Sequence, residues 1–96
     1  MEIRLVVIID AVPGKGAALA RAFAERAIET RREDGCIQFE AFLSADNPDR
    51  VAVLERWRDQ AALDAHAKLL KTHYPPLAPE LRSGMQREDY AYARSR

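Results

Sequence analysis

Residues 2–12 alternate in the manner of a β-strand. One face would carry Ile3, Leu5, Val7 and Ile9. The opposite face is also apolar at its centre, where Val6 and Ile8 lie. A strand with two apolar faces belongs in a sheet that is covered on both sides. The pattern therefore predicts a central strand in a sheet that needs a cover on each face.

Three further stretches show the same alternation. Residues 36–43 predict a second strand, with Phe39 and Phe42 in the core on opposite sheet faces. From Arg50 a third strand would place on one side Val51, Val53, Glu55 and Trp57. The Asp-Asn-Pro-Asp turn at residues 46–49 favours a hairpin between them, because proline fixes one dihedral and Asx side chains bond back to the backbone. Residues 85–94 predict a last strand.

Two segments show the three-and-four spacing of a helix. Residues 15–33 end before Gly35 and carry an inward stripe of Leu19, Phe23, Ala27 and Thr30. Residues 60–71 follow Asp59, a suitable N-cap, and carry an inward stripe of Leu63, His66, Ala67 and Leu70. Pro75 and Pro76 then bend the chain, and the spacing of Leu77 and Leu81 favours one more turn.

The order strand, helix, strand, strand, helix, strand predicts a ferredoxin-like α+β fold, βαββαβ, over residues 1–96 as a single domain. Such a fold is a four-stranded antiparallel sheet with two helices on one face. The second apolar face would stay exposed on a monomer. We therefore expect a homodimer that packs sheet face against sheet face.

Composition narrows the function classes. Fifteen basic and fifteen acidic residues leave no net charge to attract nucleic acid. The longest apolar run, residues 5–9, is too short to cross a membrane, and no leader pattern precedes it, so the cytoplasm is the expected location. Cys36 is the single cysteine, which excludes an internal disulfide and leaves no second thiol for a zinc site. We expect no bound metal.

The third strand runs almost directly into the second helix, and this junction is the best candidate for a site. Glu55 and Trp57 would end one strand beside a helix that carries His66 inward, so the three side chains could share a cavity wall. Structural roles compete with this interpretation. His66 could be a buried hydrogen-bonding residue, His73 a helix cap, Trp57 a core ring and Glu55 half of an ion pair.

Four short motifs, taken in order along the chain, carry a resemblance to a known family. They are Gly35-Cys36-Ile37-Gln38-Phe39-Glu40, Asn47-Pro48-Asp49-Arg50, Glu55-Arg56-Trp57 and Leu63-Asp64-Ala65-His66. Together they resemble the antibiotic biosynthesis monooxygenase family along nearly the whole chain. The resemblance implies a dimeric α/β barrel with a pocket in each subunit between sheet and helices. His73 looks like the counterpart of a second family histidine. The haem-degrading branch expects other residues at Val7, at His66 and in residues 74–79, so we expect no haem.

The resemblance implies oxygenation of a quinol- or anthrone-like aromatic compound without metal or flavin. Such chemistry needs an apolar cavity, a general base and hydrogen-bond donors. His66 or His73 could be the base. Trp57 and Tyr74 could donate hydrogen bonds and ring surface, and Phe39 and Glu55 could also contact the substrate.

Two other functions remain open on the same scaffold. One is a non-catalytic protein that binds a small aromatic ligand, or a stress-responsive dimeric barrel. The other is an isomerase or lyase, which would move protons without consuming oxygen.

Overall fold

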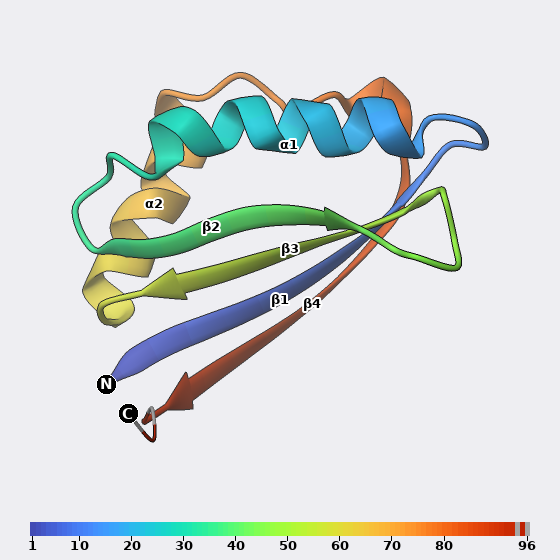
Figure 1. The fold of residues 1–96 in the computed structure, drawn as a ribbon. Coiled ribbons are helices and arrows are strands. Elements are labelled where there is room, and N and C mark those ends of the chain that lie inside the picture. Colours follow the sequence, from blue (N-terminus) through green and yellow to red (C-terminus); the bar gives the residue numbers. More distant parts are fainter. Residues whose placement is uncertain (94, 96) are drawn as a thin grey trace.

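The computed structural model describes residues 1–93 and 95. Its elements in chain order are β1 (Glu2–Ala11), α1 (Gly16–Thr30), β2 (Cys36–Leu43), β3 (Arg50–Trp57), α2 (Gln60–Thr72), the short 3₁₀ helix η1 (Pro79–Leu81) and β4 (Arg82–Tyr92). Both α-helices cover the same face of one sheet (Figure 1). The predicted ferredoxin-like α+β fold is confirmed.

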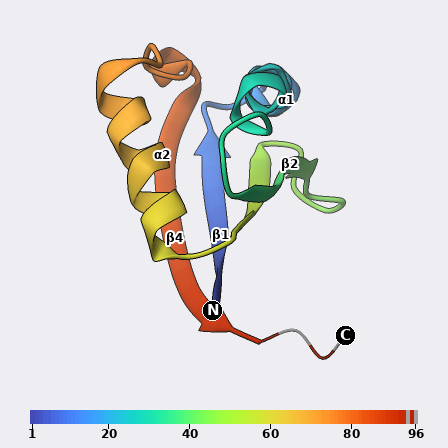
Figure 2. The ribbon, with the colours of Figure 1, turned by 90° about the vertical axis from the view of Figure 1, so that its left-hand side faces the viewer.

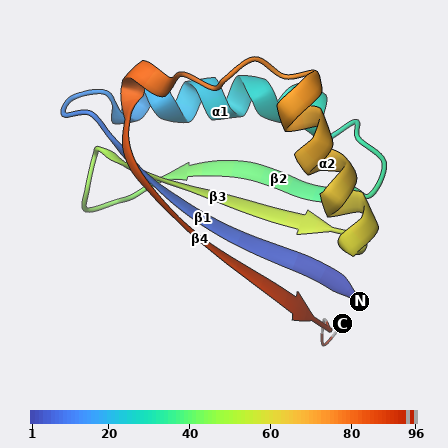
Figure 3. The same cartoon turned by 180° about the vertical axis from the view of Figure 1, so that it is seen from behind.

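The four strands form an antiparallel sheet in the order β2-β3-β1-β4. In the central pair, Ile3 lies opposite Trp57 and Asp10 opposite Arg50. Figure 3 shows β4 at the edge beside β1, and Figure 2 shows α1 above the β2 side of the sheet. This register places the odd-numbered residues of β1 and β3 together on the helix-covered face.

The hydrophobic core lies between that face and the two helices. Its β1 members are Ile3, Leu5, Val7, Ile9 and Ala11. β3 contributes Val51, Val53 and Trp57, and Trp57 has no exposed surface (0%). Leu19, Ala27 and Thr30 of α1 are buried as predicted. None of the helices formed by residues 1–93 is long and apolar enough to span a membrane.

α1 ends three residues earlier than predicted, because the chain forms a narrower turn directly after Thr30. The backbone N–H of Arg32 bonds to the carbonyl of Glu29, and that of Glu33 to the carbonyl of Thr30, each at 3.0 Å. This three-residue spacing is that of a 3₁₀ turn. Gly35 follows in the left-handed region at φ +85°, as a residue without Cβ can. Glu33 consequently lies in a turn rather than in the helix.

β4 begins at Arg82, three residues before the predicted start. A register shift between Asp10 and Ala11 lets Gly84 pair with Asp10 and Arg82 with Ala11. The segment Arg-Ser-Gly carries no apolar alternation, so its sequence gave no strand signal. The prediction ended at Arg94, which lies outside the described residues.

Within residues 1–93, neither helix covers the second sheet face, as Figure 1 shows. Val6, Ile8 and Leu54 are only half-buried there. Phe42, which was predicted in the core, is 42% exposed on this face, because both helices lie on the other side.

The predicted inward stripe of α2 was also too long. It is buried as far as His66, whereas Ala67 and Leu70 are exposed.

Candidate functional site

The position of His66 follows from the way β3 leads into α2. Asp59 accepts a hydrogen bond from the backbone N–H of Ala62 at 2.9 Å, which confirms Asp59 as the N-cap. The helix therefore starts with Ala62, Leu63 and His66 turned toward the sheet. A cap at this position fixes which residues of α2 face the interior.

The imidazole of His66 stacks on the indole of Trp57. The ring centroids are 4.6 Å apart and the planes are tilted by 31°. Both residues are buried, Trp57 completely and His66 with 4% of its surface exposed. Trp57 therefore lies behind His66 and holds the orientation of the imidazole plane.

One edge of the imidazole is bound by a carboxylate. His66 Nδ1 lies 2.9 and 3.0 Å from the two carboxylate oxygens of Glu33, and the Tyr74 hydroxyl donates to Glu33 Oε2 at 2.6 Å. Because a carboxylate only accepts hydrogen bonds, Nδ1 must carry a proton. In a neutral ring Nε2 is then an acceptor. Nε2 has no hydrogen-bond partner among residues 1–93 and 95.

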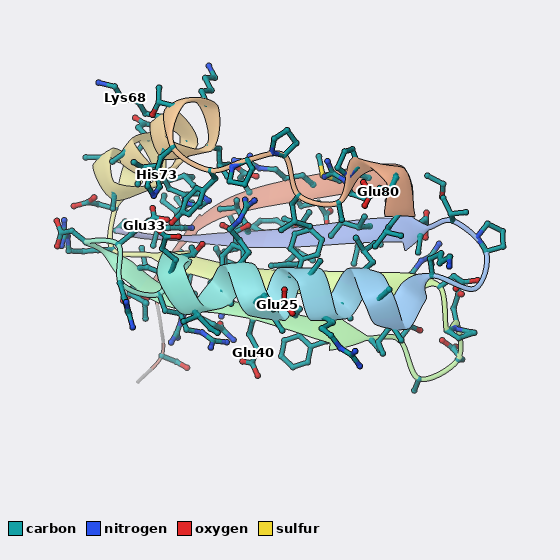
Figure 4. The ribbon with its side chains drawn as sticks, turned by 90° about the horizontal axis from the view of Figure 1, so that it is seen from above. Glu25, Glu33, Glu40, Lys68, His73 and Glu80 are labelled. Atoms are coloured by element: carbon teal, nitrogen blue, oxygen red, sulfur yellow. The ribbon has the colours of Figure 1, made fainter. Side chains whose placement is uncertain are left out.

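Glu33 is a candidate site residue that the sequence analysis did not identify. As the end of a predicted helix it would have faced solvent, whereas the turn after Thr30 directs its side chain to His66. Figure 4 labels Glu33 where the end of α1 approaches α2. The available signal was an acidic residue two positions before a helix-ending glycine, Gly35. That signal is too common in proteins to identify a site.

The Tyr74 hydroxyl keeps its proton over the whole physiological range. Burial and the hydrogen bond to Glu33 raise the pKa of Tyr74 to about 12. Tyr74 therefore donates a hydrogen bond to one oxygen of the Glu33 carboxylate at every physiological pH. The carboxylate has further acceptor positions, and His66 Nδ1 binds there. Tyr74 and Glu33 together fix the position of the imidazole.

Glu55 is a second ionisable group beside the imidazole. Its Oε1 accepts a hydrogen bond of 2.9 Å from Trp57 Nε1. Burial raises the pKa of Glu55, although the Trp57 N–H and the nearby His66 act in the opposite direction. Glu55 thus stays protonated to a higher pH than an exposed glutamate does. A protonated carboxyl can donate as well as accept.

Replacing Glu55 by glutamine should change the pH dependence of folding. Because the native pKa is raised, the native state binds the proton more tightly than the unfolded state, and the free energy of unfolding falls as pH rises above the ordinary value of about 4.3. Glutamine still accepts from Trp57 but does not titrate. We expect the stability of Glu55→Gln relative to the natural protein to increase between acidic and neutral pH in urea titrations.

The control for this prediction is Glu25→Gln. Glu25 is exposed on α1, on the side away from the sheet (Figure 4). A stability difference for Glu55→Gln that is independent of pH would contradict the direction of the shift.

A cavity of about 260 Å³ opens beside His66, between the sheet and the helices. Phe39, Glu55 and His66 line it, as predicted for a pocket in this place. Most of the wall is apolar and comes from Val7, Phe23, Phe39, Leu70, Pro75, Pro76, Leu77 and Met85. The volume is below the roughly 300 to 1,000 Å³ of pockets for drug-sized ligands.

Three residues that were predicted for the site lie off this wall. Trp57 stands behind His66, because the indole is fully enclosed in the core. Tyr74 contacts Glu33 instead of the cavity. His73 is more than half exposed and lies 2.7 Å from Glu29 Oε1, because α2 ends there and its last turn faces solvent. The structure thus places His66, but not His73, at the cavity.

Cys36 lies close to both acids of the site. Burial and the charges of Glu33 and Glu55 raise the pKa of Cys36 to about 11, so it remains a thiol rather than a nucleophilic thiolate. No three side chains of His, Cys, Asp or Glu come together in a metal-binding group within residues 1–93 and 95.

The fold and the site define a class of protein: a small ferredoxin-like domain with a mostly apolar cavity between sheet and helices and an oriented histidine on its wall. The antibiotic biosynthesis monooxygenase family model matches residues 3–73, and the chain belongs to this family. Proteins of the family commonly form dimers and bind small molecules. No curated protein matches the chain.

Several solved structures are similar to this chain. A protein from Shewanella oneidensis is 34% identical, with a TM-score of 0.78, over 93% of this chain and 88% of that one. A protein from Pseudomonas aeruginosa is 24% identical, with a TM-score of 0.79, over 97% and 95%. The structure of an antibiotic biosynthesis monooxygenase is 21% identical, with a TM-score of 0.76, over 96% and 99%. The last two matches show the common fold.

Proposed function

We propose that this protein is a monooxygenase that oxidises a small quinol-like aromatic compound without metal or flavin. The observation that carries the proposal is the free Nε2 of His66 on an apolar cavity wall, with Nδ1 held by Glu33. The family assignment supports the reaction class. The cavity volume favours a hydroquinone or naphthohydroquinone over a larger ring system.

The chemistry starts with proton transfer. His66 Nε2 takes a proton from a phenolic hydroxyl, and Glu33 stabilises the imidazolium that forms. The resulting anion is electron-rich enough to reduce dioxygen. One oxygen atom then enters the ring as a hydroxyl and the other leaves as water, while the hydroquinone supplies four electrons and becomes a hydroxyquinone. Glu55, on the same wall, can return a proton to the developing oxygen anion.

The direct test uses 1,4-dihydroxynaphthalene in ¹⁸O₂ with the natural protein. We expect a hydroxynaphthoquinone that carries one labelled atom, formed faster than the spontaneous oxidation measured without protein. Simple oxidation to the quinone leaves the ring unlabelled. A product without ¹⁸O would remove the monooxygenase proposal.

One observation also favours an isomerase or lyase. Glu55 and His66 are two titratable groups on one wall, which is what proton transfer between two positions of a substrate requires. That activity would transform its substrate under nitrogen, whereas the monooxygenase would be inactive there. Saturable binding with no turnover in either atmosphere would favour a ligand-binding protein.

We also propose that a second copy of the chain covers the open sheet face. The supporting observations are the half-buried Val6, Ile8 and Leu54 at its centre and the exposed Phe42 and Tyr90 nearby. A domain of this size gains stability when such a face is removed from water.

A further inference from the structure

Three arginines line the cavity together with the proposed base. Arg26 comes from α1, and Arg82 and Arg87 come from β4. The lining contains one acidic side chain among the described residues, Glu55. Guanidinium groups remain charged at any physiological pH. The wall therefore carries an excess of positive charge around an otherwise apolar space.

The three arginines differ in how their charge is balanced. Arg87 donates two hydrogen bonds of 2.7 Å to the carboxylate of Asp89, which neutralises it and fixes its position. Arg26 donates to the backbone carbonyl of Pro75, and its Cζ lies 4.7 Å from the centre of the Tyr74 ring. Neither of these Arg26 contacts supplies a negative charge.

The side chain of Arg82 differs from those of both Arg26 and Arg87. It is half-buried, yet it has no hydrogen bond or ion pair with any side chain of residues 1–93 and 95. A partly buried cation is costly unless an anion meets it. Water or a ligand must therefore satisfy its guanidinium, and the planar fork of donors matches the two oxygens of a carboxylate.

We propose that the substrate is an aromatic acid whose carboxylate binds Arg82, with support from the charge of Arg26, while a ring hydroxyl faces His66. This inference rests on the proposed function for the reacting hydroxyl. Recognition of the acid rests on the arginines alone. The apolar wall accepts the ring system, and the arginines orient it so that one end is bound before any chemistry occurs.

The test compares two ligands that differ in charge and hardly in shape, 1-hydroxy-2-naphthoate and 1-hydroxy-2-naphthamide. Isothermal titration calorimetry at neutral pH measures the affinity of each. We expect the acid to bind about ten- to a hundredfold more tightly than the amide, as a charge-assisted hydrogen-bonded pair does. Arg82→Gln should reduce this preference to near unity, and Arg82→Lys should keep part of it.

Arg21→Gln is the matched control, because Arg21 is exposed on α1 and does not line the cavity. It should leave the preference unchanged. Equal affinity for acid and amide, absence of binding by both, or a preference that survives Arg82→Gln would overturn the inference.

Failure of the inference and failure of the proposed function give different results. Preferential binding of the acid with no ¹⁸O incorporation from 1,4-dihydroxy-2-naphthoate would support the arginine site and remove the monooxygenase. Labelled product from 1,4-dihydroxynaphthalene, with no preference for the acid in binding, would keep the monooxygenase and remove the arginine site.

Discussion

His66→Gln is expected to lower kcat for quinol oxygenation by about 10²- to 10⁴-fold, the usual contribution of a general base. Glutamine retains a polar side chain that can reach Glu33, but it cannot take a proton from a phenol. The stacking position over Trp57 stays filled, which limits the loss of stability. The measurement is initial-rate oxygen uptake with 1,4-dihydroxynaphthalene, corrected for spontaneous oxidation.

The chain supplies its own control in the second histidine. His73 also pairs with a glutamate, Glu29, but the pair is exposed and lies off the cavity. His73→Gln should therefore change kcat by less than about twofold, because a surface ion pair contributes little. An unchanged rate in His66→Gln, or a large loss confined to His73→Gln, would contradict the assignment of the base.

The same comparison extends to the two glutamates. Glu33→Gln removes the carboxylate that holds His66 Nδ1, and an amide can accept or donate, so the tautomer of the ring is no longer fixed. We expect kcat to fall on the order of a hundredfold with little change in KM, since the effect is on orientation and charge stabilisation. Glu29→Gln is the control. A rise in KM alone would indicate that Glu33 serves binding or structure.

Alternation along the chain was sufficient to predict most of the sheet. β2 has the predicted bounds, and β3 begins at Arg50 with the predicted residues buried. A strand turns successive side chains to opposite faces of the sheet, so apolar residues at every second position indicate a strand with one buried face. The edge strand β4 carried a weaker signal, because its residues Arg82 to Gly84 are held by pairing with β1 rather than by burial.

The site was predicted in part, for a similar reason. His66 and Glu55 belong to regular elements, so their direction followed from periodicity. Glu33 belongs to a turn, and its direction depends on a tightened helix end that apolar spacing does not encode. Trp57 was placed on the correct sheet face, but the depth of burial that separates a core ring from a cavity wall depends on packing in three dimensions.

The open sheet face leads to the second large effect. Leu54→Asp should convert the proposed dimer into a monomer, because Leu54 lies beside Val6 at the centre of the face that neither α1 nor α2 covers. Burying an unpaired carboxylate against apolar side chains costs several kcal/mol, so the dissociation constant should rise on the order of a thousandfold. Sedimentation equilibrium at micromolar concentrations measures this directly.

Ala24→Asp adds the same charge on the exposed side of α1 and should leave the dimer intact. A natural protein that sediments as a monomer, or a dimeric Leu54→Asp, would remove the sheet-to-sheet arrangement. The monomeric variant also separates assembly from chemistry, since the cavity and the contact of His66 with Glu33 lie on the opposite face of the sheet from Leu54. Ligand binding should therefore persist in it, and its loss would mean that the second subunit helps to close the cavity.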